Sequence, residues 1–127
     1  MSSIVTGSGR SAIKKERLLN EIIDWATDVR KYASIPHIID PNSYNQMMSA
    51  DRFFTLKYNG KKFLIAVKKQ AIGDDLQSLL SNAIEFLNKN WRDFATKRSR
   101  LEEIVEELDK IGETIIEKAE DLLSSNS

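Results

Sequence analysis

Cysteine is absent from this chain of 127 residues, and histidine occurs once, at His37. The lack of cysteine excludes disulfides, thiol chemistry and metal sites built from thiolates. A single histidine beside one aspartate, Asp40, predicts neither a histidine metal site nor a catalytic triad. We therefore expect no cofactor and no metal.

Long apolar runs are also missing. No segment approaches the roughly 20 apolar residues of a membrane span. Residues 1–10 are small and polar, without the apolar core of a signal peptide. These absences predict a cytoplasmic protein that has no membrane partner.

Proline is confined to Pro36 and Pro41, and the only glycine beyond Gly73 is Gly112. Helix breakers are therefore nearly absent from the C-terminal half, where an apolar residue recurs at every seventh position. That column is Leu80, Leu87, Phe94, Leu101, Leu108, Ile115 and Leu122. Such spacing keeps one seam of a helix facing one partner.

One continuous helix over residues 74–123 is the preferred interpretation, and a hairpin of two helices is the alternative. A continuous helix is about 75 Å long, at about 1.5 Å per residue, which exceeds the width of a domain of this size. The column therefore predicts self-association, most simply as a homodimer, or docking on another protein. The predicted association seam is Leu101, Ile104, Leu108, Ile111, Ile115 and Leu122.

Residues 11–33 predict a first helix, because apolar side chains recur there at three-and-four spacing. The stripe consists of Leu18, Leu19, Ile22, Trp25, Ala26, Val29, Tyr32 and Ala33. Asp74 and Gln77 have the spacing of a capping box, which predicts the start of the long helix at Asp74.

Residues 52–58 and 61–69 are rich in apolar and aromatic side chains and flank Asn59-Gly60. Asn-Gly is the preferred pair for a two-residue type I′ turn, so this segment predicts a β-hairpin. An isolated hairpin is marginal in water, so helices must cover its apolar face. The predicted fold is α+β and mostly helical, with the N-terminal helix and the long C-terminal helix packed around a two-stranded hairpin.

The predicted organisation has four parts. Residues 1–10 form a disordered tail, residues 11–95 form a globular body, and residues 124–127 form a frayed end. Residues 96–123 form an acidic amphipathic helix that extends the last helix of the body and is coiled-coil-like.

The second predicted strand resembles the strand of restriction-endonuclease-like nucleases that carries an acid, any residue and then a lysine. The matching positions are Ala66 and Lys68, and the hairpin register places Asp51 opposite Lys68. The resemblance implies that Asp51 and Lys68 serve catalysis, but Ala66 stands where that family has its second carboxylate. A hard cation needs oxygen ligands, so we expect a degenerate site without nuclease activity, or an ordinary surface ion pair.

The net charge of zero is the sum of a basic N-terminal part and an acidic C-terminal part. Residues 1–100 carry 17 basic and 10 acidic side chains, whereas residues 101–127 carry two basic and nine acidic ones. The acidic helix is expected to pack beside the basic body, in the same or a neighbouring subunit. If it does not, basic residues interleaved with aromatics suit a phosphate backbone. The candidate contacts are Lys57, Lys61, Lys62, Lys68, Lys69, Lys97 and Arg98.

These observations favour a non-enzymatic interaction or assembly protein that uses its C-terminal helix. The alternatives are a nucleic-acid-binding accessory protein and a degenerate nuclease domain.

Overall fold

The computed structural model describes residues 7–31, 43–96 and 98–125, and nearly all of these are helical. Side chains are described for residues 14–31, 51–93, 99–100 and 102–125. The elements, in chain order, are α1 (Gly7–Lys31), α2 (Ser43–Lys69), α3 (Asp74–Thr96), the short 3-10 helix η3 (Arg98–Arg100) and α4 (Leu101–Ser124).

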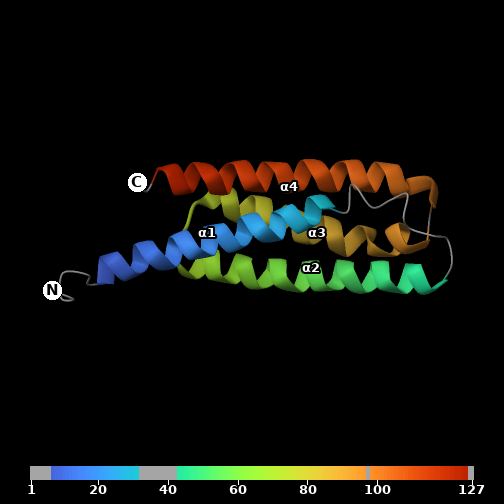
Figure 1. Ribbon diagram of the computed structural model, residues 1–127, viewed down its shortest axis with the longest axis horizontal. Helices are drawn as coiled ribbons and strands as arrows, with labels where there is room; N and C mark the ends of the chain where they lie inside the picture. The colour runs from blue at the N-terminus through green and yellow to red at the C-terminus, as the bar shows by residue number, and fades with distance from the viewer. Residues whose placement is uncertain (1–6, 32–42, 97, 126–127) are drawn as a thin grey trace.

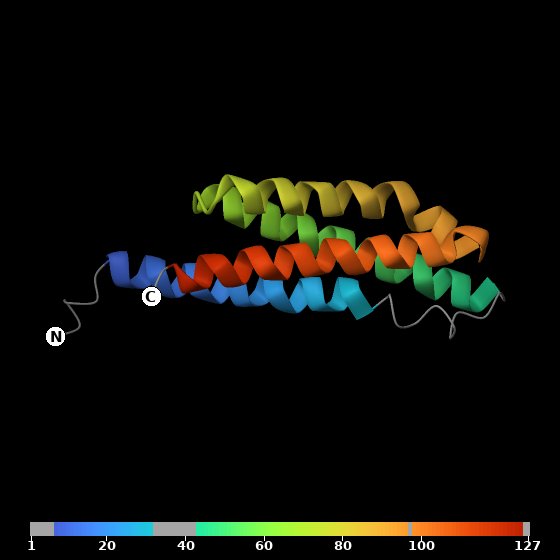
Figure 2. The same ribbon diagram turned by 90° about the horizontal axis from the view of Figure 1, so that it is seen from above.

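The four long helices form an elongated bundle in which consecutive helices run in opposite directions (Figure 1). Helix α2 lies against α3 and helix α1 lies against α4, and these two pairs make the closest contacts. Looser contacts join α3 with α4 and α1 with α2 (Figure 2). Among the described residues, no Cα atom of α2 lies within 8 Å of one of α4, so these two helices occupy opposite corners of the bundle.

Helix α1 confirms the predicted first helix, although it begins at Gly7, within the segment expected to be a disordered tail. Its apolar stripe is buried, and Leu19, Ile22 and Val29 have no exposed surface. Tyr32 and Ala33 lie outside the described residues. Removal of this stripe and of the apolar faces of the other helices from water is the main favourable contribution to the free energy of folding.

The predicted β-hairpin is wrong, because residues 43–69 form the single helix α2 and the described residues contain no strand. The same residues also satisfy a helical period. Phe53, Leu56, Gly60 and Val67 recur at three, four and seven residues, and all four are buried. The α+β fold class is therefore corrected to an all-helical bundle.

Gly60 provides space between helices instead of forming a turn. A Cβ atom at this position would lie 2.8 Å from Cζ2 of Trp25 and 3.2 Å from Cγ1 of Ile84. The Trp25 indole Nε1 donates a hydrogen bond of 2.9 Å to the backbone carbonyl of Leu56, so its polar atom is satisfied within the core. The lack of a side chain at Gly60 thus lets α1 and α3 approach α2 closely.

The preferred continuous C-terminal helix is also wrong. Helix α3 begins at Asp74, as predicted, but it ends at Thr96, and the chain then reverses through η3 into α4. The reversal folds the seven-residue column back on itself. The column's Leu80 and Leu87 on α3, and Leu108 and Ile115 on α4, are buried within one chain.

Among the described residues, no helix has both the length and the apolar composition needed to cross a membrane.

The turn between α2 and α3 follows a Schellman pattern. The N–H of Ile72 donates to the carbonyl of Val67, and the N–H of Ala71 donates to that of Lys68. Val67 and Ile72 are both buried, which adds the apolar contact that accompanies this motif. Ala71 occupies the left-handed position with φ 55°, where glycine is the usual residue.

We expect Ala71→Gly to stabilise the protein by about 0.5–1 kcal/mol, because glycine adopts positive φ without the Cβ clash that alanine suffers. Urea denaturation followed by circular dichroism measures the free energy of unfolding. A matched Ala66→Gly variant, inside α2, must be destabilised by about 1 kcal/mol instead. Equal effects at the two positions contradict the assignment of strain to Ala71.

Gly112 gives a second test of close packing, this time between α4 and α1. A Cβ there would overlap Cγ of Arg30 and would lie 2.8 Å from the backbone oxygen of Ala26. Helix propensity alone predicts that Gly112→Ala stabilises α4. We expect the opposite sign, a loss of about 1–3 kcal/mol in thermal or urea unfolding, because the Ala26 backbone is fixed by its own helix. Thr114→Ala, at an exposed position on the same helix, is the control and should change stability by less than about 0.5 kcal/mol.

Candidate docking surface

Three large hydrophobic side chains are exposed among the described residues, and all three belong to α2. Phe54 is 40% exposed, Tyr58 is 62% exposed and Ile65 is 66% exposed. They are four and seven residues apart, which places them along one line on the outer side of the helix. We call these three residues the α2 row.

Basic side chains flank this row on both sides. By helical spacing, Lys57, Lys61 and Lys68 follow one side, and Lys62 and Lys69 follow the other. The four lysines from Lys61 to Lys69 are exposed, and Lys57 is half-buried. These five lysines and the α2 row form what we call the α2 face.

Helix α3 supports one end of the α2 face. The ring of Phe54 lies 4.8 Å from that of Trp91, between centroids, so part of the Phe54 side chain is held in place by α3. Lys57 donates a hydrogen bond of 3.1 Å to Asn88 and lies 5.1 Å from the Phe54 ring centroid. Lys62 lies at the same distance over the Tyr58 ring. These cation–π contacts keep ammonium groups beside the row.

Helix α4 carries charge of the opposite sign at the opposite corner of the bundle. It has nine acidic and two basic side chains, whereas α2 has six basic and one acidic. Helix α4 packs against α1 and α3 and does not contact α2 among the described residues. The acidic helix thus does not neutralise the lysines of the α2 face by direct contact.

The predicted association seam lies inside the chain. Ile104, Leu108 and Ile115 are fully buried, while Ile111 and Leu122 are half-buried. The side chain of Leu101 lies outside the described set. Two ion pairs fix α4 in this position, from Arg30 to Asp109 at 2.9 Å and from Lys118 to Asp75 at 3.2 Å. The Asp109 carboxylate, which accepts a hydrogen bond from Arg30, raises the pKa of that guanidinium above its ordinary value.

The proposed nuclease geometry does not form. Asp51 and Lys68 belong to one helix and lie 17 residues apart, which is about 25 Å along its axis. Asp51 and Lys68 are both exposed, and Ala66 on the same helix is half-buried. Within the described residues, no three His, Cys, Asp or Glu side chains come together as a metal site does. The predicted pairing of Asp51 with Lys68 depended on the hairpin register, and it is wrong because these residues form a helix instead.

The sequence-based nucleic-acid candidates divide into two groups. The five lysines of α2 share one face, as described above. The side chains of Lys97 and Arg98, beside the α3–α4 turn, lie outside the described set. Sequence reasoning missed the exposure of the α2 row, because the hairpin register assigned Phe54, Tyr58 and Ile65 to a covered face.

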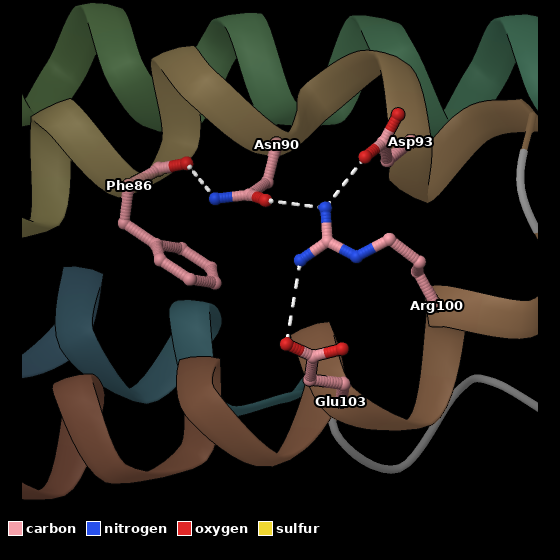
Figure 3. Close-up of polar contacts among 5 residues, drawn as sticks. All are labelled: Phe86, Asn90, Asp93, Arg100 and Glu103. Carbon is pink, nitrogen blue, oxygen red and sulfur yellow. Dashed lines mark hydrogen bonds and ion pairs between the residues drawn. The ribbon is translucent and has the colours of Figure 1, made fainter.

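A separate polar cluster lies at the α3–α4 turn (Figure 3). The Arg100 guanidinium donates to Asp93 at 2.5 Å, to the side-chain oxygen of Asn90 at 3.3 Å and to Glu103 at 3.5 Å. Asn90, only 8% exposed, donates in turn to the carbonyl of Phe86 at 2.9 Å. The hydrogen bond to Asp93, followed by that to Glu103, raises the pKa of Arg100. This cluster joins the end of α3 to the start of α4.

Comparisons with protein-family models, with curated proteins and with solved structures found no match. The function proposed below therefore rests on the geometry and charge of the described residues.

Proposed function

We propose that this chain is a non-enzymatic docking protein that binds an acidic, amphipathic helix of a partner protein on the α2 face. The observation that carries this proposal is the α2 row, three large apolar side chains exposed on one line and bordered by lysines. A contiguous exposed apolar patch with a polar rim is typical of interaction sites. The proposal moves the docking site from α4, whose apolar seam is buried, to α2.

The chemistry of the partner follows from the two components of the face. The α2 row needs an apolar cover, and the lysines need acidic groups on either side of that cover. An amphipathic helix with acidic flanks supplies both along the whole length of the row. The charges add orientation and speed of encounter more than affinity, because surface ion pairs are individually weak.

Nucleic acid is the second candidate, and a specific observation favours it: the lysines of α2 lie far from the acidic α4. Phosphates match those lysines, and an exposed aromatic such as Tyr58 suits base stacking. Ile65, the most exposed of the three, gains no cover from a sugar–phosphate backbone. The apolar row therefore favours a protein partner.

The proposal is tested with a fluorescent helical peptide that has leucine at the seam positions and glutamate elsewhere. We expect binding by anisotropy at near-physiological salt. Tyr58→Ser combined with Ile65→Ser should weaken it by about tenfold or more, because the apolar cover is lost. Lys61→Gln combined with Lys62→Gln should reduce mainly the association rate and its salt dependence.

Matched control variants distinguish binding at the α2 face from a general effect of the protein's net charge. Lys14→Gln combined with Lys110→Gln removes the same charge from exposed positions on α1 and α4, and binding should stay within about twofold. A peptide with lysine in place of glutamate should not bind. Equal loss in the two charge variants, or no loss in the Tyr58 and Ile65 variant, contradicts docking on the α2 face.

The same proteins titrated with single-stranded and duplex DNA decide between the two candidates. We expect weak DNA binding, poorer than about 10 μM at physiological salt, as is usual for non-specific contact. Submicromolar, salt-sensitive DNA binding that depends on Lys61 and Lys62, without peptide binding, establishes the nucleic-acid alternative in place of the protein partner.

A further inference from the structure

The α3–α4 turn has only a weak local signal, the capping-box spacing of Ser99 and Glu102. Neither glycine nor proline occurs between Asp74 and Ile111. Arg100, just before α4, has helical backbone angles of −100° and −4°, and no side chain caps the first turn. Helices usually begin after Ser, Thr, Asp or Asn, whose side chains accept from the free N–H groups. Ser99 precedes the N-cap residue Arg100 by one residue, and the start of α4 has no side-chain cap.

Tertiary contacts of Arg100 hold the reversal instead (Figure 3). Its guanidinium reaches back to Asp93 and Asn90 on α3 while it also contacts Glu103 on α4. In a continuous helix, positions 93 and 100 are about 10 Å apart along the axis, beyond the three- and four-residue spacing at which side chains meet. The contact with Asp93 therefore belongs to the closed turn.

The seven-residue apolar column keeps its spacing whether the chain reverses after α3 or continues as one helix. Leu80 and Leu87 on α3 and Leu108 and Ile115 on α4 are buried, and their seven-residue spacing continues through positions 94 and 101 in the sequence. A helix that runs straight from α3 into α4 keeps this column on one side. Its second half then projects beyond the bundle with its apolar face uncovered.

We propose that a second copy of this chain covers that face: α3 and α4 join into one helix, and α4 packs on α1 and α3 of the other copy. The Arg30–Asp109 and Lys118–Asp75 pairs and the fit of Gly112 against Ala26 re-form between chains. Each copy gives and receives one α4, so the exchange closes as a symmetric dimer and does not propagate. This dimer uses the α4 seam and leaves the α2 face free.

Sedimentation velocity on the wild-type chain and two hinge variants tests the exchange, after refolding at high protein concentration. We expect a dimer for the wild type. Arg100→Ala should raise the dimerisation constant by about tenfold or more, because both closed turns lose a charge-assisted hydrogen bond. Insertion of Gly-Ser-Gly after Lys97 should remove the dimer, because it lengthens the turn and interrupts the continuous helix. A wild type and an Arg100→Ala variant that both stay monomeric, or three proteins with equal dimer fractions, overturn the proposal.

Cross-linking distinguishes exchange from ordinary surface association. The chain lacks cysteine, so Arg30→Cys in one preparation and Asp109→Cys in another place single thiols on α1 and α4, at positions whose native side chains are 2.9 Å apart. After the two are refolded together, a short bismaleimide should link one chain of each kind. The control pair, Arg30→Cys with Ser81→Cys on α3, should not be linked, because among the described residues no Cα atom of α1 lies within 8 Å of one of α3. A dimer without the first cross-link, or with equal yields for both pairs, shows surface association and overturns the exchange.

Discussion

The approach of Trp25 to Gly60 determines how α2 is oriented in the bundle. A residue with any side chain at position 60 meets the indole ring, so α2 must turn this position toward α1 and α3. The hydrogen bond from the indole to the carbonyl of Leu56 fixes the same rotation from the neighbouring turn. Once Gly60 points inward, Tyr58 and Ile65 must point outward by helical geometry. The exposed α2 row is thus a consequence of the core contact on the other side of the helix.

The bundle also separates its charges. Helix α2, which has the largest excess of basic over acidic side chains, and helix α4, which has the largest excess of acidic ones, occupy opposite corners. The mixed helices α1 and α3 lie between them. A chain with no net charge therefore presents one basic and one acidic side. Such a separation would steer the acidic partner that we propose toward α2 and away from α4. Total charge conceals this arrangement, because only the fold decides which helices are neighbours.

The sequence predicted the first helix from its periodic apolar stripe and the start of α3 from the capping-box spacing of Asp74 and Gln77. The sequence-based prediction was wrong at residues 52–69, where the apolar residues fit both the two-residue period of a strand and the period of a helix. Apolar residues there alternate closely enough for strands, and Asn59-Gly60 supplies a turn, yet Phe53, Leu56, Gly60 and Val67 also form a helical stripe. Only the distant Trp25 decides between the two, and local patterns do not contain that contact.

The second failure has a different cause. The sequence between Thr96 and Leu101 contains neither glycine nor proline, and the capping-box spacing of Ser99 and Glu102 is not used by the start of α4. Local patterns therefore predict the reversal only weakly. The candidate docking surface was missed because of the wrong β-hairpin. In that hairpin, Phe54, Tyr58 and Ile65 belonged to the apolar face that helices were expected to cover. An amphipathic pattern shows how many faces a segment must bury, but it does not show which other segment covers them.

The apolar face of α4 must be covered in every state of the chain, but the source of the cover depends on concentration. Within one chain, the four residues between α3 and α4 keep α4 close to α1, with an effective concentration on the order of millimolar. A second copy offers the same surface at its actual concentration, without the cost of closing the turn. A wild-type chain that folds below the millimolar range closes the turn with Arg100, whereas refolding at higher concentration favours the exchange of α4 that gives the dimer. Loss of that single side chain changes the balance between the two arrangements without altering any residue of the seam. The seven-residue column is therefore compatible with both a monomer and a dimer, and the contacts at the turn decide between them.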